Sequence, residues 1–117
     1  MVKFYLVRND GKITKFYAEG HARFAKHGQD VVCAAVSAVS QNTILGIIRY
    51  LKIDAKYFVG KSGFLSLELD GVDIQGKREQ LDVLLETMAI TLKEIEKEYP
   101  RNLVVIEKDW KRREKSV

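Results

Sequence analysis

The fold begins with Val2-Lys3-Phe4-Tyr5-Leu6-Val7-Arg8-Asn9-Asp10-Gly11-Lys12-Ile13-Thr14-Lys15-Phe16-Tyr17-Ala18. On both sides of the turn in this stretch, the side chains alternate between the two faces of a strand. An Asp-Gly pair between two alternating segments is typical of a β-hairpin, because this pair accepts the positive φ angles of a tight turn. A second alternation covers residues 56–59 and 64–69, around Gly60-Lys61-Ser62-Gly63. The sequence therefore predicts two β-hairpins.

Two helices are predicted, one after each hairpin. Residues 31–51 are apolar almost all round, so we expect this helix to be buried on more than one side, with one covering layer supplied by a second subunit. Residues 77–99 carry one apolar stripe and a charged face, and Pro100 ends this helix. Residues 103–106 are apolar on both faces, which predicts an interior strand.

The predicted element order is therefore β-β-α-β-β-α-β. Hairpins that alternate with helices indicate the α/β (α+β) class, here a two-layer sandwich of a mixed sheet and two helices. A chain of 117 residues can bury one modest core and is too short for two. We expect a single α/β domain over residues 1–110 and a basic C-terminal tail over residues 111–117.

The composition, 46% hydrophobic and 31% charged, is that of a soluble globular protein. A single cysteine excludes an internal disulfide and suits a reducing compartment. We expect no stretch that reaches the roughly 18 apolar residues of a membrane span, and residues 1–5 alternate like a strand rather than forming the apolar block of a signal peptide. We therefore expect a cytoplasmic protein with no membrane partner.

The formal net charge is +4, and residues 108–115 hold five cations against two acids. Clustered cations of this kind can contact RNA phosphates. A solvated, frayed terminus also explains them, and we favour that interpretation. Direct nucleic-acid binding is therefore not expected from the charge pattern.

The candidate catalytic residues lie in Gly20-His21-Ala22 and in residues 28–37. We expect Cys33 about three residues into a helix, where unpaired N–H groups and the helix dipole favour a thiolate. A nearby histidine supplies the general base of thiol catalysis, and the N–H groups at the helix start can stabilise an oxyanion. The alternative interpretation is a small buried hydrophobe in an apolar helix.

His21 is the preferred base, because it lies at the end of a predicted strand beside small residues that permit close approach of another backbone or a substrate. His27 lies in the middle of a loop, where a solvated role is expected. Asp30 either caps the helix or orients the histidine, and its charge opposes thiolate formation. Ser37 and Ser40 share a predicted polar stripe of the helix with Asp30 and Cys33, although such hydroxyls also bond to the carbonyls of their own helix.

No cofactor and no metal is predicted. Two histidines and one cysteine lack a zinc-binding spacing. The glycines at residues 60–63 lack the spacing of a phosphate-binding loop, and a hairpin turn explains them.

The motif Gly20-His21-Ala22 followed by Gly28-Gln29-Asp30-Val31-Val32-Cys33-Ala34-Ala35-Val36-Ser37 closely resembles the signature of the ribosomal-processing cysteine protease family (Prp). The length and the element order fit as well, so the resemblance covers essentially the whole chain. By position, it implies that Cys33 is the nucleophile and His21 the general base, with Asp30, Ser37 and Gly20 as supporting residues of the motif.

The resemblance also implies a bacterial protease domain that removes a short N-terminal extension from a large-subunit ribosomal protein, cutting after an aromatic residue and before alanine. It implies a homodimer with a mobile loop between the histidine and the cysteine. Two other functions are compatible with the residues alone. One is a non-enzymatic RNA- or ribosome-binding module with a buried structural cysteine, and the other is a thiol redox sensor.

Overall fold

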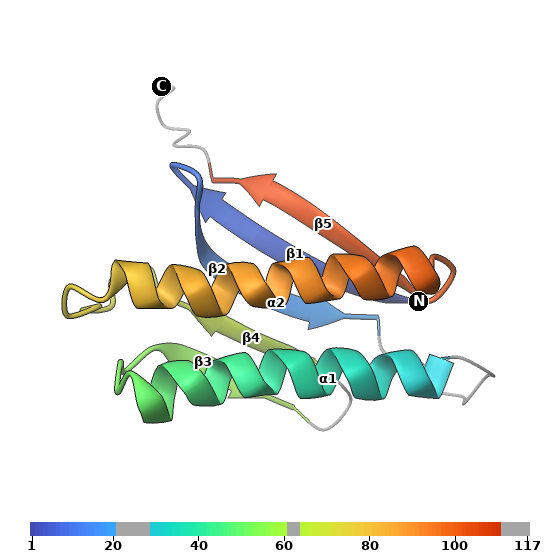
Figure 1. The fold of residues 1–117 in the computed structure, drawn as a ribbon, viewed down its shortest axis with the longest axis horizontal. Coiled ribbons are helices and arrows are strands. Elements are labelled where there is room, and N and C mark those ends of the chain that lie inside the picture. Colours follow the sequence, from blue (N-terminus) through green and yellow to red (C-terminus); the bar gives the residue numbers. More distant parts are fainter. Residues whose placement is uncertain (21–28, 61–63, 111–117) are drawn as a thin grey trace.

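A computed structural model describes residues 1–20, 29–60 and 64–110. It contains a five-stranded sheet of order β3-β4-β2-β1-β5. Two helices lie side by side over one face of this sheet (Figure 1). The predicted mixed sheet with two helices is confirmed. Along the chain the elements are β1 (Val2–Asn9), β2 (Lys12–Glu19), α1 (Gln29–Leu45), η1 (Gly46–Tyr50), β3 (Lys56–Val59), β4 (Leu65–Glu68), α2 (Arg78–Glu98) and β5 (Leu103–Asp109).

The first hairpin forms as its sequence predicts. β1 and β2 pair antiparallel, and the turn places Asp10 at φ 58° and Gly11 at φ 81°. Both angles lie in the left-handed region that tight hairpin turns require. β2 continues the antiparallel pairing with β4, and β4 pairs with β3. β2 is therefore the central strand, and its last residues lie beside the first residues of β1 and β4.

The prediction of an interior strand at residues 103–106 is wrong. β5 pairs in parallel with β1 alone among the described strands, so it forms an edge of the sheet. Its apolar character on both faces has two separate causes. Leu103 and Val105 belong to the core beneath the helices, whereas Ile106 is half-buried on the opposite face, beside its pairing partner Tyr5.

The first helix is divided into α1 and a π-helical turn, η1. α1 begins at Gln29, so Asp30 lies in its first turn rather than before it, and Cys33 lies one residue beyond the first four. The segment Val31–Tyr50 has a mean hydropathy of 1.8 and is long and apolar enough to cross a membrane, judged by length and composition only. One such helix is weak evidence, because the core helix of a soluble protein passes the same test. Here its inward side chains, Val32, Val36, Ile44 and Ile47, belong to the core.

The core lies between the sheet and the two helices. Its largest fully buried side chains are Phe4, Phe16, Leu6, Ile13, Ile47, Ile53, Leu65, Leu67, Leu81, Leu85, Met88 and Leu92. They come from every layer of the fold, so the helices and the sheet stabilise each other.

Arg8 links three elements at one end of the sheet. Its guanidinium donates two hydrogen bonds to the Glu86 carboxylate on α2, at 2.7 and 3.1 Å, and one to Glu107 on β5, at 2.7 Å. Lys93 also pairs with Glu107. The hydrogen bond from Arg8, and to a smaller extent that from Lys93, holds the pKa of Glu107 below its usual range. Such charge-assisted pairs fix geometry as well as adding stability.

Candidate active site

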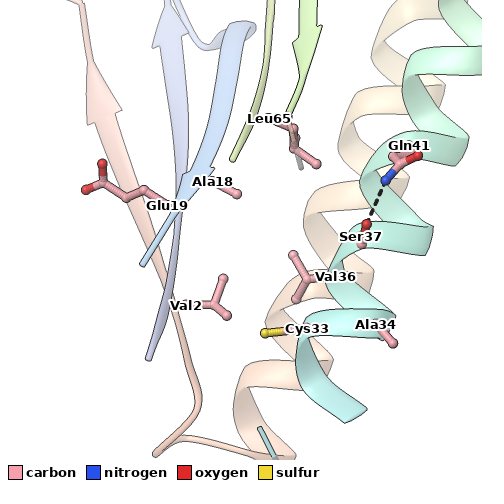
Figure 2. Close-up of a pocket in the computed structure, with 10 residues that line it drawn as sticks. Val2, Ala18, Glu19, Cys33, Ala34, Val36, Ser37, Gln41 and Leu65 are labelled. Atoms are coloured by element: carbon pink, nitrogen blue, oxygen red, sulfur yellow. Dashed lines mark hydrogen bonds between the residues drawn. The ribbon is translucent and has the colours of Figure 1, made fainter. Parts of the chain in front are cut away.

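A hollow of about 310 Å³ lies between α1 and the sheet, where β2 ends and β1 and β4 begin. Cys33 and Ser37 contribute to it from the inward side of α1, and Val2 closes it from β1. The full lining is Val2, Ala18, Glu19, Cys33, Ala34, Val36, Ser37, Gln41, Gly60 and Leu65. Figure 2 shows the Cys33 sulfur directed towards Val2. Val36 and Leu65 lie above the sulfur in this view.

Cys33 is half-buried and packs against the edge of the core. It therefore differs from the fully enclosed cysteine that the buried-hydrophobe interpretation requires, because its surface opens into the hollow. The side chains around it are mainly small or apolar. An apolar wall limits access of water and strengthens electrostatic interactions inside the site.

The polar side of the hollow consists of a hydrogen-bonded pair. Gln41 donates from Nε2 to the Ser37 Oγ at 2.7 Å (Figure 2). Ser40, on the same predicted stripe, instead donates to the Val36 carbonyl at 2.7 Å and is fully buried. The two serines thus differ in their surroundings. Sequence spacing did not identify Gln41, although it lies four residues after Ser37 and eight after Cys33, on the same helix face.

Among the described residues that line the hollow, only Glu19 is charged, and its carboxylate points away from Cys33 (Figure 2). It accepts a hydrogen bond from the Tyr5 hydroxyl at 3.0 Å on the other face of the sheet. This bond raises the pKa of Tyr5. The negative charge of Glu19 is therefore directed away from the thiol.

Gly20 follows β2 directly and has φ +82°, a conformation that glycine adopts without strain. A Cβ atom at this position would lie 2.4 Å from the backbone oxygen of Met1. The close approach of another backbone, expected from the small residues beside His21, is therefore present, and the neighbour is the start of β1. Gly60 also lines the hollow, at the end of β3, and no sequence motif marks it as a site residue.

His21 and His27 lie outside the described residues, as does the Asp30 side chain. Among the predicted site residues, the structure brings Cys33 and Ser37 to one hollow, with Gly20 immediately after Glu19 at its margin. In the described ranges, no three His, Cys, Asp or Glu residues form a group that could hold a metal ion. A thiol beside a hollow with an apolar and a polar side, within two turns of a helix start, is suited to attack on a bound acyl group.

Comparison with known proteins points to one family. The family model described as "Cysteine protease Prp" matches residues 1–104. The ribosomal processing cysteine protease Prp of Bacillus subtilis is 34% identical over 99 residues, covering 83% of this chain and 88% of that protein. The Prp of Staphylococcus aureus is 35% identical over 100 residues, covering 83% and 89%.

Solved structures agree with the sequence relatives. An S. aureus Prp structure in complex with a substrate peptide has a TM-score of 0.81 and 28% identity, covering 92% of this chain and all of that chain. The structure of SMU.848 from Streptococcus mutans has a TM-score of 0.77 at 19% identity, covering 94% and 99%, and shows the shared fold.

Proposed function

The chain belongs to the Prp family of cysteine proteases, and from this premise we propose that it removes a short N-terminal extension from a large-subunit ribosomal protein. Relatives at about one-third identity are named as ribosomal processing proteases. A structural neighbour is described with a substrate peptide and, in a second structure, with a covalently linked product peptide. The observation that carries the proposal is the half-buried Cys33 at the hollow beside Gly20.

In the proposed mechanism the Cys33 thiolate attacks the scissile carbonyl and forms a C–S bond. The tetrahedral intermediate collapses as the C–N bond breaks, and His21 gives its proton to the leaving amine. Water, deprotonated by the same histidine, then hydrolyses the thioester and releases the acyl product and the thiol. The unpaired N–H groups at the start of α1 are the proposed donors to the oxyanion.

Supporting roles follow from position. Gly20 sets the backbone immediately before His21, Asp30 complements the positive end of the α1 dipole, and Ser37 holds the polar side of the hollow through Gln41. The apolar part of the hollow is the proposed binding site for a substrate side chain next to the scissile bond. In this proposal the nucleophilic sulfur of Cys33 belongs to α1, and the base, His21, belongs to the segment that follows β2.

The test uses a peptide that spans the junction between the extension and the mature protein, with products measured by mass spectrometry. The parent protein is expected to cleave it at one bond, and Cys33→Ala and His21→Ala are each expected to abolish cleavage. His27→Ala is the matched control and should retain activity. Full cleavage by either of the first two variants would contradict the assignment, and loss only in His27→Ala would transfer the role of base to His27.

We also propose a cytoplasmic homodimer. The outward side of the first helix leaves three large apolar residues exposed, namely Val31 at 59%, Leu45 at 46% and Tyr50 at 84%. An apolar stripe of this kind favours a second subunit as its cover. Leu45→Lys should then shift the protein towards the monomer in sedimentation velocity, whereas Ile90→Lys on α2 should not. An unchanged sedimentation coefficient for Leu45→Lys would exclude this face as the interface.

A further inference from the structure

The face of the sheet that the helices do not cover carries a row of aromatic residues. Strand pairing places Tyr5 opposite Tyr17, Tyr17 opposite Ser66, and Ser66 opposite Phe58. Adjacent paired residues in a sheet project to the same face, so the row crosses β1, β2, β4 and β3 in the order Tyr, Tyr, Ser, Phe. The small Ser66 therefore separates two large rings.

A hollow of about 440 Å³ occupies this gap. Tyr17 and Phe58 are on opposite sides of it, and Ser66 lies between them. Their strands are two positions apart, so the two backbones lie about 10 Å from each other. This separation allows one planar ring to enter between two others. The full lining is Lys15, Tyr17, Glu19, Lys56, Tyr57, Phe58, Phe64, Ser66 and Glu68.

Neighbouring residues hold both rings in place. Tyr17 stacks on Tyr5, with centroids 4.5 Å apart and planes 13° from parallel. Phe58 contacts Phe64, with centroids 5.9 Å apart. It also lies so close to Gly60 that a Cβ there would be 2.9 Å from the Phe58 ring. Tyr17 is thus held from outside the hollow by Tyr5, and Phe58 is held by Phe64, which also lines the hollow, yet Phe58 remains 55% exposed.

Lysines dominate the adjacent row of the same face. Lys15 and Lys56 both lie opposite Glu68, and Lys108 lies at the same level on β5. Lys15 Nζ is 5.3 Å from the Tyr17 ring centroid, and Lys108 Nζ is 4.8 Å from that of Tyr5. This row holds three cations and one carboxylate. Glu68 Oε1 lies 4.0 Å from Lys15 Nζ, and Glu19 also lines the hollow, so the positive charge of this row comes from Lys56 and Lys108 beyond that pair.

We propose that this outer face binds single-stranded nucleic acid, with one base inserted between Tyr17 and Phe58 and the neighbouring phosphates paired with Lys15 and Lys56. Aromatic rings on a sheet and lysines along its strands complement the two parts of a nucleotide, a planar base and an anionic backbone. An acidic peptide supplies the charge but not the regularly spaced planar rings. The site lies on the opposite face of the sheet from Cys33.

The experiment measures fluorescence anisotropy of labelled ten-nucleotide oligouridine and oligodeoxyuridine, which differ only in the ribose 2′-hydroxyl, with the full chain carrying Cys33→Ala. Phe58→Ala should weaken binding by about 5- to 100-fold, the usual effect of removing one base-stacking ring. Ile90→Ala is the matched control, because Ile90 is an exposed apolar residue on α2, on the helix side, outside the proposed dimer face. It should leave the affinity within about twofold, as expected for a surface substitution away from the site.

A charge-reversal pair tests the pairing of lysines with phosphates. Lys15→Glu should reduce the slope of log K against log salt by about 0.7 for each phosphate that is no longer neutralised, whereas Lys97→Glu on α2 should not. Equal binding of both oligonucleotides would assign recognition to base and phosphate, and a preference for oligouridine would add the ribose hydroxyl.

Three outcomes would overturn the proposal. These are no measurable binding of either oligonucleotide at low salt, equal losses of affinity in the Phe58 and Ile90 variants, and binding that disappears only when residues 111–117 are removed. Peptide cleavage by Phe58→Ala, in a protein that retains Cys33, separates this result from the proposed function. Normal cleavage with weakened oligonucleotide binding supports the site and shows that the variant is folded.

Discussion

Replacing Gly20 by alanine should destabilise the protein far more than the same replacement at Gly11. Both glycines have nearly the same left-handed backbone, with φ +82° at Gly20 and φ +81° at Gly11. Their surroundings differ, since a Cβ at Gly11 meets nothing within 4 Å, whereas one at Gly20 lies 2.4 Å from the Met1 oxygen. Gly11→Ala therefore measures the backbone cost alone.

The Met1 oxygen cannot move away easily. It belongs to the same peptide unit as the Val2 N–H, which donates to the Asn102 oxygen at 2.9 Å, and the Val2 side chain is buried in the core. A left-handed alanine costs about 1–2 kcal/mol, of which about 0.4–1 kcal/mol is offset by the reduced entropy of the unfolded chain. Relieving the contact adds about 1–3 kcal/mol, the range for inserting a group into a packed site.

We therefore expect Gly11→Ala to cost about 1 kcal/mol and Gly20→Ala about 2–4 kcal/mol. For a domain of this size, these costs correspond to falls in Tm of about 3–6 °C and about 6–24 °C. Differential scanning calorimetry of the two variants beside the parent protein gives both values. Equal falls in Tm would refute this reasoning, because the contact with Met1 would then carry no energy.

Two further predictions concern the core and the charged network. Leu85→Ala should lower the free energy of unfolding by about 2–5 kcal/mol, because its side chain is fully buried, whereas the exposed Ile90→Ala on the same helix should change it by less than about 0.5 kcal/mol; urea titration measures both. Glu107 has its pKa lowered in the folded state, chiefly by Arg8, so its contribution is present above the usual carboxyl pKa and is lost as the pH falls through the folded value. The Tm of the parent protein should therefore fall more steeply than that of Glu107→Gln between about pH 5 and pH 3. Parallel curves of Tm against pH for the two proteins would contradict this expectation. Glu94→Gln is the control, because the Glu94 side chain is 67% exposed.

Local sequence patterns predict the hairpins and helices well, and they predict less well what depends on distant segments. The Asp10-Gly11 turn is a local signal, so the first hairpin follows from it. The edge position of β5 depends on pairing with β1, which is about a hundred residues away, and no short pattern encodes such a partner.

The candidate site shows the same division. The position of Cys33 near a helix start followed from local sequence, and the family signature strengthened its assignment. The hollow beside it did not follow, because Val2, Gly60 and Leu65 reach it from three separate strands or strand ends. Helical spacing grouped Ser37 with Ser40, and only the packing distinguishes the serine in the hollow from the serine bonded to its own helix. The catalytic roles of Cys33 and His21 stay predictions.

The parallel pairing of β1 with β5 has a consequence for synthesis of the chain. Val2 closes the hollow beside Cys33, and its backbone is fixed by Asn102 and Leu103. The two hairpins and α1 can form while the chain is still emerging from the ribosome, because their contacts are local. The hollow is completed only when the last strand has been translated and has joined the first. A nascent chain therefore carries Cys33 before the hollow beside it is complete.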